Sequence, residues 1–106
     1  MLRDYARLGR VLASNGMSSG RPIVPKQWLL ASMSEPVDTG SSLVRYGYHL
    51  WLSADAKRFM LWGLRGQHVL ADPETGLVLV QTSLGSEDFL ELELAELWAA
   101  ARSQLR

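Results

Sequence analysis

The residues best suited to ligand chemistry lie together in one short segment, Trp62 to Gln67. Gly63 and Gly66 have no side chain to hold a ligand away from the backbone, and free strand amides there can donate to an oxyanion or an amide carbonyl. Arg65 and Gln67 carry donors that can bind a carboxylate or polar end of a substrate. The segment therefore predicts a substrate-facing edge formed by Trp62, Gly63, Arg65, Gly66 and Gln67. The alternative is that both glycines only form a bent strand connection or a bulge.

A second motif with possible chemistry is Asp38-Thr39-Gly40, the triplet found in aspartic proteases. A chain of this size could form the homodimer that brings two such aspartates together around one shared proton. Against this alternative, Glu35-Pro36 stands where an apolar strand is needed, and no clear apolar-apolar-Gly partner segment follows at a suitable distance. We therefore give a dimeric aspartic protease a low rank among the candidate functions.

The chain has no recognisable serine nucleophile. Ser-x-x-Lys, Tyr-x-Asn and Lys-Thr-Gly are all absent. Residues 16–20 match Gly-x-Ser-x-Gly, but a nucleophile elbow follows a strand, whereas this segment follows a predicted helix, so we expect a loop. His49 and His68 have no acidic partner at ligand spacing, so we expect no metal site and no cofactor.

Composition limits the remaining classes of function. The chain has 106 residues, nearly half of them apolar, which suits one domain over residues 1–106 with its own core. Eleven acidic residues balance eleven basic ones, and this gives no support for nucleic acid or an anionic membrane as partner. No apolar run approaches the length of a membrane span, no secretory signal opens the chain, and there is no cysteine. We expect a cytoplasmic protein, although the missing cysteines leave the redox compartment open.

Helices are predicted at both ends of the chain. Apolar residues recur at helical spacing from Met1 to Leu12, and Asn15-Gly16 supplies a stop, but Met1 stands where an N-capping residue is expected. A short second helix begins at Pro25 and runs to about Met33, before the turn residues 35–42. Ser86 can cap a long C-terminal helix with the following predicted buried stripe: Leu90, Leu94, Leu97, Trp98, Ala101 and Leu105.

Between the helices the sequence predicts about four antiparallel strands. From Arg45 to Leu52 apolar and aromatic residues alternate, which indicates one strand. Further strands are predicted at 58–62, 67–71 and 77–82, and Asp72 to Gly76 is a hairpin turn. We expect the four tryptophans to lie mostly in the core, with Trp51 or Trp62 as candidates for a cleft. The expected fold class is α+β: two N-terminal helices, an antiparallel meander and a C-terminal helix packed on it.

Four segments, in this order, resemble a known family: Arg3–Gly9, Pro25–Trp28, Tyr46–Trp51 and Trp62–Val80. They are similar to the 6-aminohexanoate-dimer hydrolase and family VIII esterase branch of the class C β-lactamase-like serine hydrolases. Trp62-Gly63-Leu64 is similar to the Trp-Gly-Gly of the esterase branch, with Leu in the last position. Asp72 resembles the family's turn aspartate, for which we expect a hairpin-capping role.

The resemblance implies hydrolysis of linear amides or esters through an acyl-enzyme, with a serine activated by a lysine three residues on and helped by a tyrosine. Family members carry these motifs upstream of the segment that Arg3 begins here. The resemblance therefore implies a C-terminal piece of such an enzyme, inactive alone and with no catalytic residue of its own. We expect it to self-associate through an exposed strand edge or by helix exchange. The alternatives are a non-catalytic binding or scaffold module and the dimeric aspartic protease using Asp38.

Overall fold

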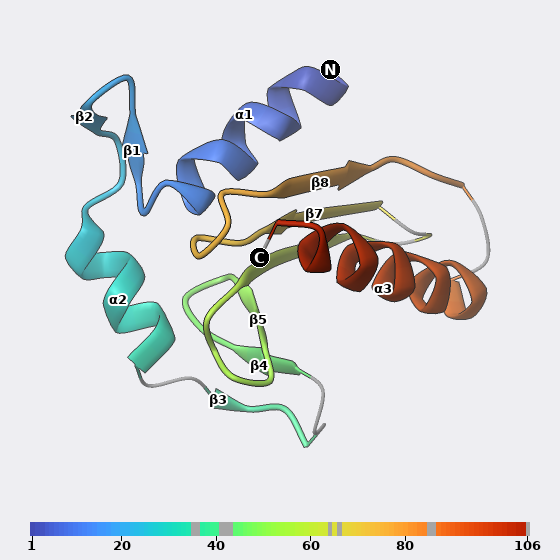
Figure 1. Ribbon diagram of the computed structural model, residues 1–106. Helices are drawn as coiled ribbons and strands as arrows, with labels where there is room; N and C mark the ends of the chain where they lie inside the picture. Colours follow the sequence, from blue (N-terminus) through green and yellow to red (C-terminus); the bar gives the residue numbers. More distant parts are fainter. Residues whose placement is uncertain (35–36, 41–43, 64, 66, 85–86, 106) are drawn as a thin grey trace.

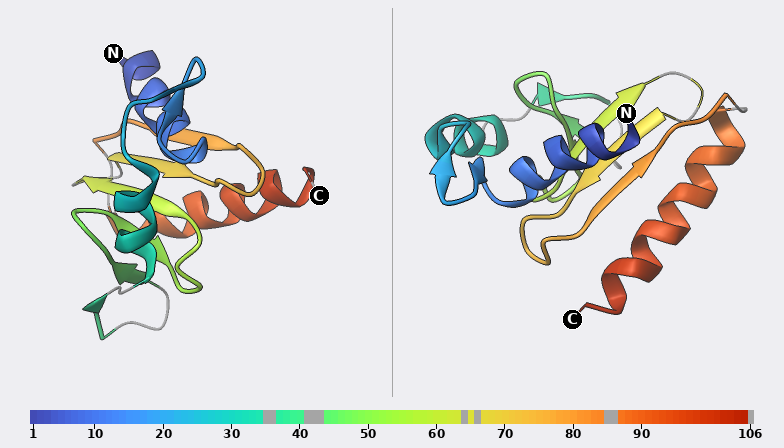
Figure 2. Two further views of the ribbon diagram at one scale, coloured as in Figure 1. Left: turned by 90° about the vertical axis from the view of Figure 1, so that its left-hand side faces the viewer. Right: turned by 90° about the horizontal axis from the view of Figure 1, so that it is seen from above.

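The computed structural model describes residues 1–34, 37–40, 44–63, 65, 67–84 and 87–105, and the side chains of 87–92 are not described. This part of the chain has α+β architecture, as predicted. A sheet lies between α1 (Leu2–Ala13) on one face and α3 (Glu87–Ser103) on the other, as Figures 1 and 2 show. None of the helices in the described part has the length and apolar composition that crossing a membrane requires.

The main sheet is an antiparallel meander in which each strand pairs with its neighbours in sequence. Its strands are β3 (Val37–Asp38), β4 (Val44–Tyr46), β5 (Trp51–Ser53), β6 (Phe59–Gly63), β7 (Gln67–Ala71) and β8 (Val78–Gln81). The last three correspond closely to the strands that the sequence predicts. A small separate hairpin, β1 (Met17–Ser18) and β2 (Arg21–Pro22), follows α1, so the Gly-x-Ser-x-Gly segment is a hairpin and not a nucleophile elbow.

The predicted single strand from Arg45 to Leu52 is wrong. These residues form β4, a turn and β5, with Tyr46 opposite Trp51. The turn is closed by the Gly47 amide, which donates to the Leu50 carbonyl at 2.8 Å, and His49 adopts a left-handed φ of 56°. Alternating polarity cannot distinguish one strand from a tight hairpin, because both preserve the period of two on either side of the turn.

The predicted break over 35–42 is also only partly correct. Val37 and Asp38 pair with Tyr46 and Arg45, which adds an edge strand to the meander. Residues 35–36 and 41–43 lie outside the described part of the chain. The meander therefore has six strands, whereas the sequence predicts four. The two additional strands are short paired segments, and no long apolar run marks them in the sequence.

The core lies between the sheet and the two N-terminal helices, α1 and α2 (Lys26–Ser34). It consists of these buried residues: Leu12, Ala13, Leu29, Leu50, Leu52, Phe59 and Ala71. Gly9 lets α1 approach the sheet, because a Cβ at this position would collide with the Val78 side chain and come within 3.1 Å of Val69. This approach fixes the C-terminal half of α1 over β7 and β8.

The amphipathic pattern of α1 is buried only in part. Leu12 is in the core, whereas Tyr5 and Leu8, nearer the start of the helix, are 52% and 45% exposed. Met1 caps the helix without a side-chain hydrogen bond, as the missing N-capping residue predicts. The first half of α1 thus has an apolar face that the described residues leave uncovered.

The predicted buried stripe of α3 is largely wrong. Leu94 is buried, but Leu97 and Leu105 are 57% and 53% exposed. Trp98 and Ala101 are partly buried, and the Leu90 side chain and the Ser86 cap lie outside the described part. Spacing identifies the face of a helix that is apolar, but it does not say how much of that face a partner covers.

Candidate functional site

A pocket lies where the first half of α1 crosses the ends of β6, β7 and β8. Its volume is about 210 Å³. It is lined by Tyr5, Leu8, Leu61, Trp62, Gly63, Gln67, His68, Val69, Val80, Gln81 and Thr82. Three of the five predicted site residues, Trp62, Gly63 and Gln67, are in this set.

Strand pairing explains why these residues meet. Gly63 lies opposite Gln67, Leu61 opposite Val69, and Val69 opposite Val80. Residues that face each other across antiparallel strands point to the same side of the sheet. Because Gly9 of α1 packs against Val69, the paired residues Leu61, Val69 and Val80 lie on the side that faces α1. The apolar floor of the pocket is therefore part of the same face that forms the core.

Gly63 lines the pocket where β6 pairs with Gln67 of β7. A Cβ at this position would come within 3.0 Å of the Gln67 Cβ and 3.3 Å of its carbonyl oxygen. Glycine thus serves a close approach between the two strand ends at the mouth of the hairpin, which fits the alternative of a bent strand connection, and ligand access at this position stays a prediction.

The other two predicted residues do not join this group. Arg65 is exposed, has a left-handed φ of 60° and is not among the described residues that line the pocket. Gly66 lies outside the described part of the chain, as does Leu64, the last residue of the Trp-Gly-Leu triplet. The expected contact of Arg65 with a ligand therefore stays a prediction.

An aromatic row runs across four strands on the opposite face of the sheet. The ring centroids of Tyr46 and Trp51 are 5.0 Å apart, those of Trp51 and Trp62 are 5.0 Å apart, and those of Trp62 and His68 are 6.0 Å apart. Trp62 is 39% exposed and Trp28, in α2, is 42% exposed, so the expectation that the tryptophans lie mostly in the core is wrong. Trp62 links this row to the rim of the pocket.

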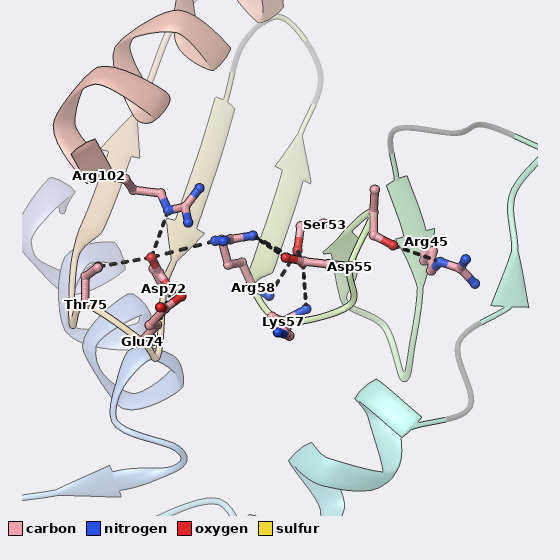
Figure 3. A network of polar contacts seen from close by, with 10 residues as sticks. Arg45, Ser53, Asp55, Lys57, Arg58, Asp72, Glu74, Thr75 and Arg102 are labelled. Carbon is pink, nitrogen blue, oxygen red and sulfur yellow. Dashed lines mark hydrogen bonds and ion pairs between the residues drawn. The ribbon is translucent and has the colours of Figure 1, made fainter. Parts of the chain in front are cut away.

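A buried carboxylate, Asp72, anchors the other end of β7 (Figure 3). Its side chain is 0% exposed and accepts hydrogen bonds from the Glu74 amide at 3.0 Å and the Thr75 hydroxyl at 3.0 Å. These bonds fix the hairpin turn and confirm the predicted capping role. Gly76 completes the turn with a φ of 76°.

Asp72 also binds two arginines, which the sequence analysis did not anticipate. Arg102 of α3 donates from Nε to Oδ2 at 2.9 Å, and Nε of Arg58 lies 3.7 Å from the same oxygen. Arg58 pairs with Asp55 at 2.9 Å as well. The cluster connects the turn before β6, the turn before β8 and the C-terminal end of α3, so its role is to hold the fold together.

Electrostatics agree with this structural role. Burial, the largest single influence, would raise the pKa of Asp72, but hydrogen bonds from Arg102, the Glu74 amide and Thr75, together with the charge of Arg102, lower it below the usual 3.8. Asp55 behaves in the same way: burial acts to raise its pKa, and hydrogen bonds from Ser53, Lys57 and Arg58 lower it. Both carboxylates are stabilised as anions, which is unlike a general acid that must hold a proton near neutral pH.

Asp38 lies in an exposed turn. Its Oδ1 accepts from the Gly40 amide at 2.9 Å, and the Thr39 hydroxyl donates to the Val44 carbonyl at 2.8 Å. These local bonds join β3 to β4 and give Asp-Thr-Gly a role as turn chemistry. Among the described residues there is also no group of three or more histidine or acidic side chains placed to hold a metal.

No family model and no curated protein matches this chain. A function for the pocket therefore has to be inferred from its geometry and its residues.

Proposed function

We propose that this chain forms part of a β-lactamase-like serine hydrolase that acts on linear amides or esters through an acyl-enzyme. The observation that carries the proposal is the pocket between α1 and the ends of β6, β7 and β8. Three of its lining residues, Trp62, Gly63 and Gln67, belong to the segment whose motifs resemble that family. Pocket geometry and motif resemblance thus point to the same strand ends.

The pocket suits the acyl part of such a substrate. Leu61, Val69 and Val80 form an apolar floor, and Leu8 and Tyr5 close it from the side of α1. Apolar walls with a few polar groups are the usual composition of small-molecule sites. In the proposal a linear aliphatic segment packs on this floor, while the Gln67 amide and the backbone near Gly63 orient the carbonyl.

The nucleophile is not part of this chain in our proposal. The sequence has no Ser-x-x-Lys, and the described residues that line the pocket include neither serine nor lysine. A serine, its lysine and the assisting tyrosine would come from another segment of the active enzyme. The chain by itself is then expected to bind substrate analogues without turnover.

The same absence favours a second candidate, a binding or scaffold module that keeps the pocket and has no associated chemistry. The two candidates differ in what accompanies the chain. The hydrolase requires a serine-bearing segment in the same active species, and the binding module requires none.

The deciding experiment uses the native protein from its source. Intact mass, labelling with a serine-directed fluorophosphonate and hydrolysis of a chromogenic short-chain ester are measured on one preparation. A labelled, active species larger than this chain supports the hydrolase. An unlabelled, inert species of this length overturns it and leaves the binding module.

Self-association belongs to the same proposal. β8 is an edge strand that pairs only with β7 among the described residues, and the first half of α1 exposes Met1, Leu2, Tyr5 and Leu8. An open strand edge and an uncovered apolar helix face both favour contact with another chain. A cytoplasmic location is also proposed, and fractionation of the native source would test it.

A further inference from the structure

A second pocket, on the other side of α1, has a composition opposite to that of the first. Its volume is about 140 Å³, and it is lined by Arg7, Arg10, Val11, Ser14, Met17, Ser18 and Ser19. Two arginines and three serines therefore line one hollow. A water molecule takes up about 30 Å³ in the liquid, so the pocket has room for a polyatomic ion.

A third arginine lies on the same side of the neighbouring hairpin. Ser18 in β1 pairs directly with Arg21 in β2, and paired residues share a face. Ser19 and Gly20 form the tight turn between these strands, with φ values of 50° and 76°. The hairpin therefore packs on α1 through β1, which brings Ser18 and Ser19 beside Arg7 and Arg10, and Arg21 follows as the strand partner of Ser18.

The positive charge of this pocket is only partly neutralised. Arg7 pairs with Asp4 at 2.9 Å, and both side chains are well exposed, so solvent screens this contact. Neither Arg10 nor Arg21 has an ion-pair partner among the described residues. In a chain with no net charge, this leaves a local excess of cationic donors.

The end of α1 does not cancel this charge, although helix carbonyls carry partial negative charge. The carbonyls of Arg10, Val11 and Leu12 accept from the amides of Ser14, Gly16 and Asn15 at 2.9, 2.7 and 3.1 Å. The Ser14 carbonyl accepts from the Met17 amide at 3.2 Å. These hydrogen bonds satisfy the carbonyls but do not remove the partial negative charge of the helix end, which the full charges of the arginines must outweigh for an anion to bind.

We propose that this pocket binds a phosphate group, held by Arg7 and Arg10 and by the hydroxyls of Ser14, Ser18 and Ser19, with Arg21, the strand partner of Ser18, adding positive charge nearby. Planar guanidinium groups donate pairs of hydrogen bonds to tetrahedral oxyanions, and a doubly charged anion matches more than one arginine. The site is independent of the hydrolase proposal, because it lies on different residues and takes a different class of ligand.

The test is a titration of the full chain with inorganic phosphate, followed by amide NMR at constant ionic strength. Saturable shifts are expected at Ser14, Met17, Ser18 and Ser19, and acetate should produce weaker ones. Arg10→Gln should weaken phosphate binding about tenfold, since it removes a charge-assisted contact. Arg3→Gln is the matched control: it removes the same charge from the same helix, and Arg3 does not line the pocket.

A variant that gains affinity makes the test sharper. Asp4→Asn removes the competing partner of Arg7 and should tighten phosphate binding. Shifts that increase linearly without saturation, an equal loss in Arg3→Gln and Arg10→Gln, or no gain in Asp4→Asn would overturn the proposed site. Glycerol 3-phosphate, titrated in parallel, should bind at least as well as inorganic phosphate, and failure to bind would contradict recognition of a phosphate group.

Discussion

Arg102 and Asp72 lie thirty residues apart in the sequence, and the Nε of the arginine donates to the buried carboxylate at 2.9 Å. The contact joins the last turn of α3 to the hairpin between β7 and β8. Among the α3 side chains that the structure describes, Leu94 is the only buried apolar one, so this bond is a principal link between the helix and the sheet.

Asp72→Ala should be strongly destabilising. It removes the acceptor that holds the hairpin turn, Arg58 and Arg102 together, and breaking a buried ion pair typically costs about 3–5 kcal/mol. Arg102→Gln should cost less, about 1.5–3 kcal/mol, because the turn bonds to Asp72 remain. Urea unfolding monitored by tryptophan fluorescence measures both, with Glu96→Gln on the exposed side of the same helix as control. Equal stability of all three variants would contradict the role of the cluster.

Stability should fall on acidification below about pH 4. The pKa of Asp72 in the folded state is lower than its usual 3.8. The ionised carboxylate therefore gives its full stabilisation above about pH 3.8, and this stabilisation is lost as the pH falls through the folded-state pKa. Asp72→Asn should flatten this decline, whereas Asp55→Asn should change it less because Asp55 is 43% exposed and screened by solvent. Unfolding free energies measured across this acid range distinguish the two carboxylates. A wild-type curve that Asp72→Asn leaves unchanged would refute the assignment.

Gly63→Val should close the pocket between α1 and the strand ends. The new side chain meets the Gln67 backbone and Cβ, and overpacking of this kind typically costs about 1–3 kcal/mol. Binding of a short linear ester or amide, followed by ligand-observed NMR, should be lost. Ala54→Val adds similar bulk in an exposed loop and should retain binding. Retained binding in Gly63→Val would place the ligand elsewhere.

Two variants distinguish the two surfaces expected to mediate self-association, the exposed face of α1 and the edge strand β8. Leu2→Lys places a charge on the exposed face of α1 and should shift the chain to monomer if helices exchange. Gln81→Lys places one on the edge strand β8 and should do so if strands pair. Light scattering coupled to gel filtration measures both against wild type. A wild-type protein that stays monomeric at high concentration would contradict association altogether.

Sequence patterns predicted the local elements better than their partners. Gly76 and Pro73 mark the β7–β8 turn, and strands β6 to β8 follow from short apolar runs between such turns. Trp62, Gly63 and Gln67 could be assigned to one site because they flank a single hairpin, where spacing determines proximity. Arg65 cannot be assigned in the same way, because its position depends on the turn backbone and not on the strand pairing.

Contacts between residues far apart in the sequence could not be predicted from such patterns. Nothing in the sequence connects Gly47 with Ser32, yet a Cβ at Gly47 would collide with the Ser32 side chain and carbonyl. The Tyr48 amide donates to the Ser32 hydroxyl at 2.9 Å, and this contact shapes the β4–β5 turn that the alternating pattern concealed. Tyr5 and Leu8 were expected on an apolar helix face, but only the position of α1 over β8 makes them walls of a pocket.

The packing of α1 against β7 and β8 also constrains how the protein is made. Each strand of the meander meets the strand before it, so hairpins can form one after another as the ribosome releases them. α1 leaves the ribosome before the meander, but its partners on the sheet are the last strands of that meander to emerge. Until β8 has been synthesised, the apolar residues of α1 remain without their native partner, and a nascent chain paused before Val78 should be a preferred target for chaperones that bind exposed apolar segments.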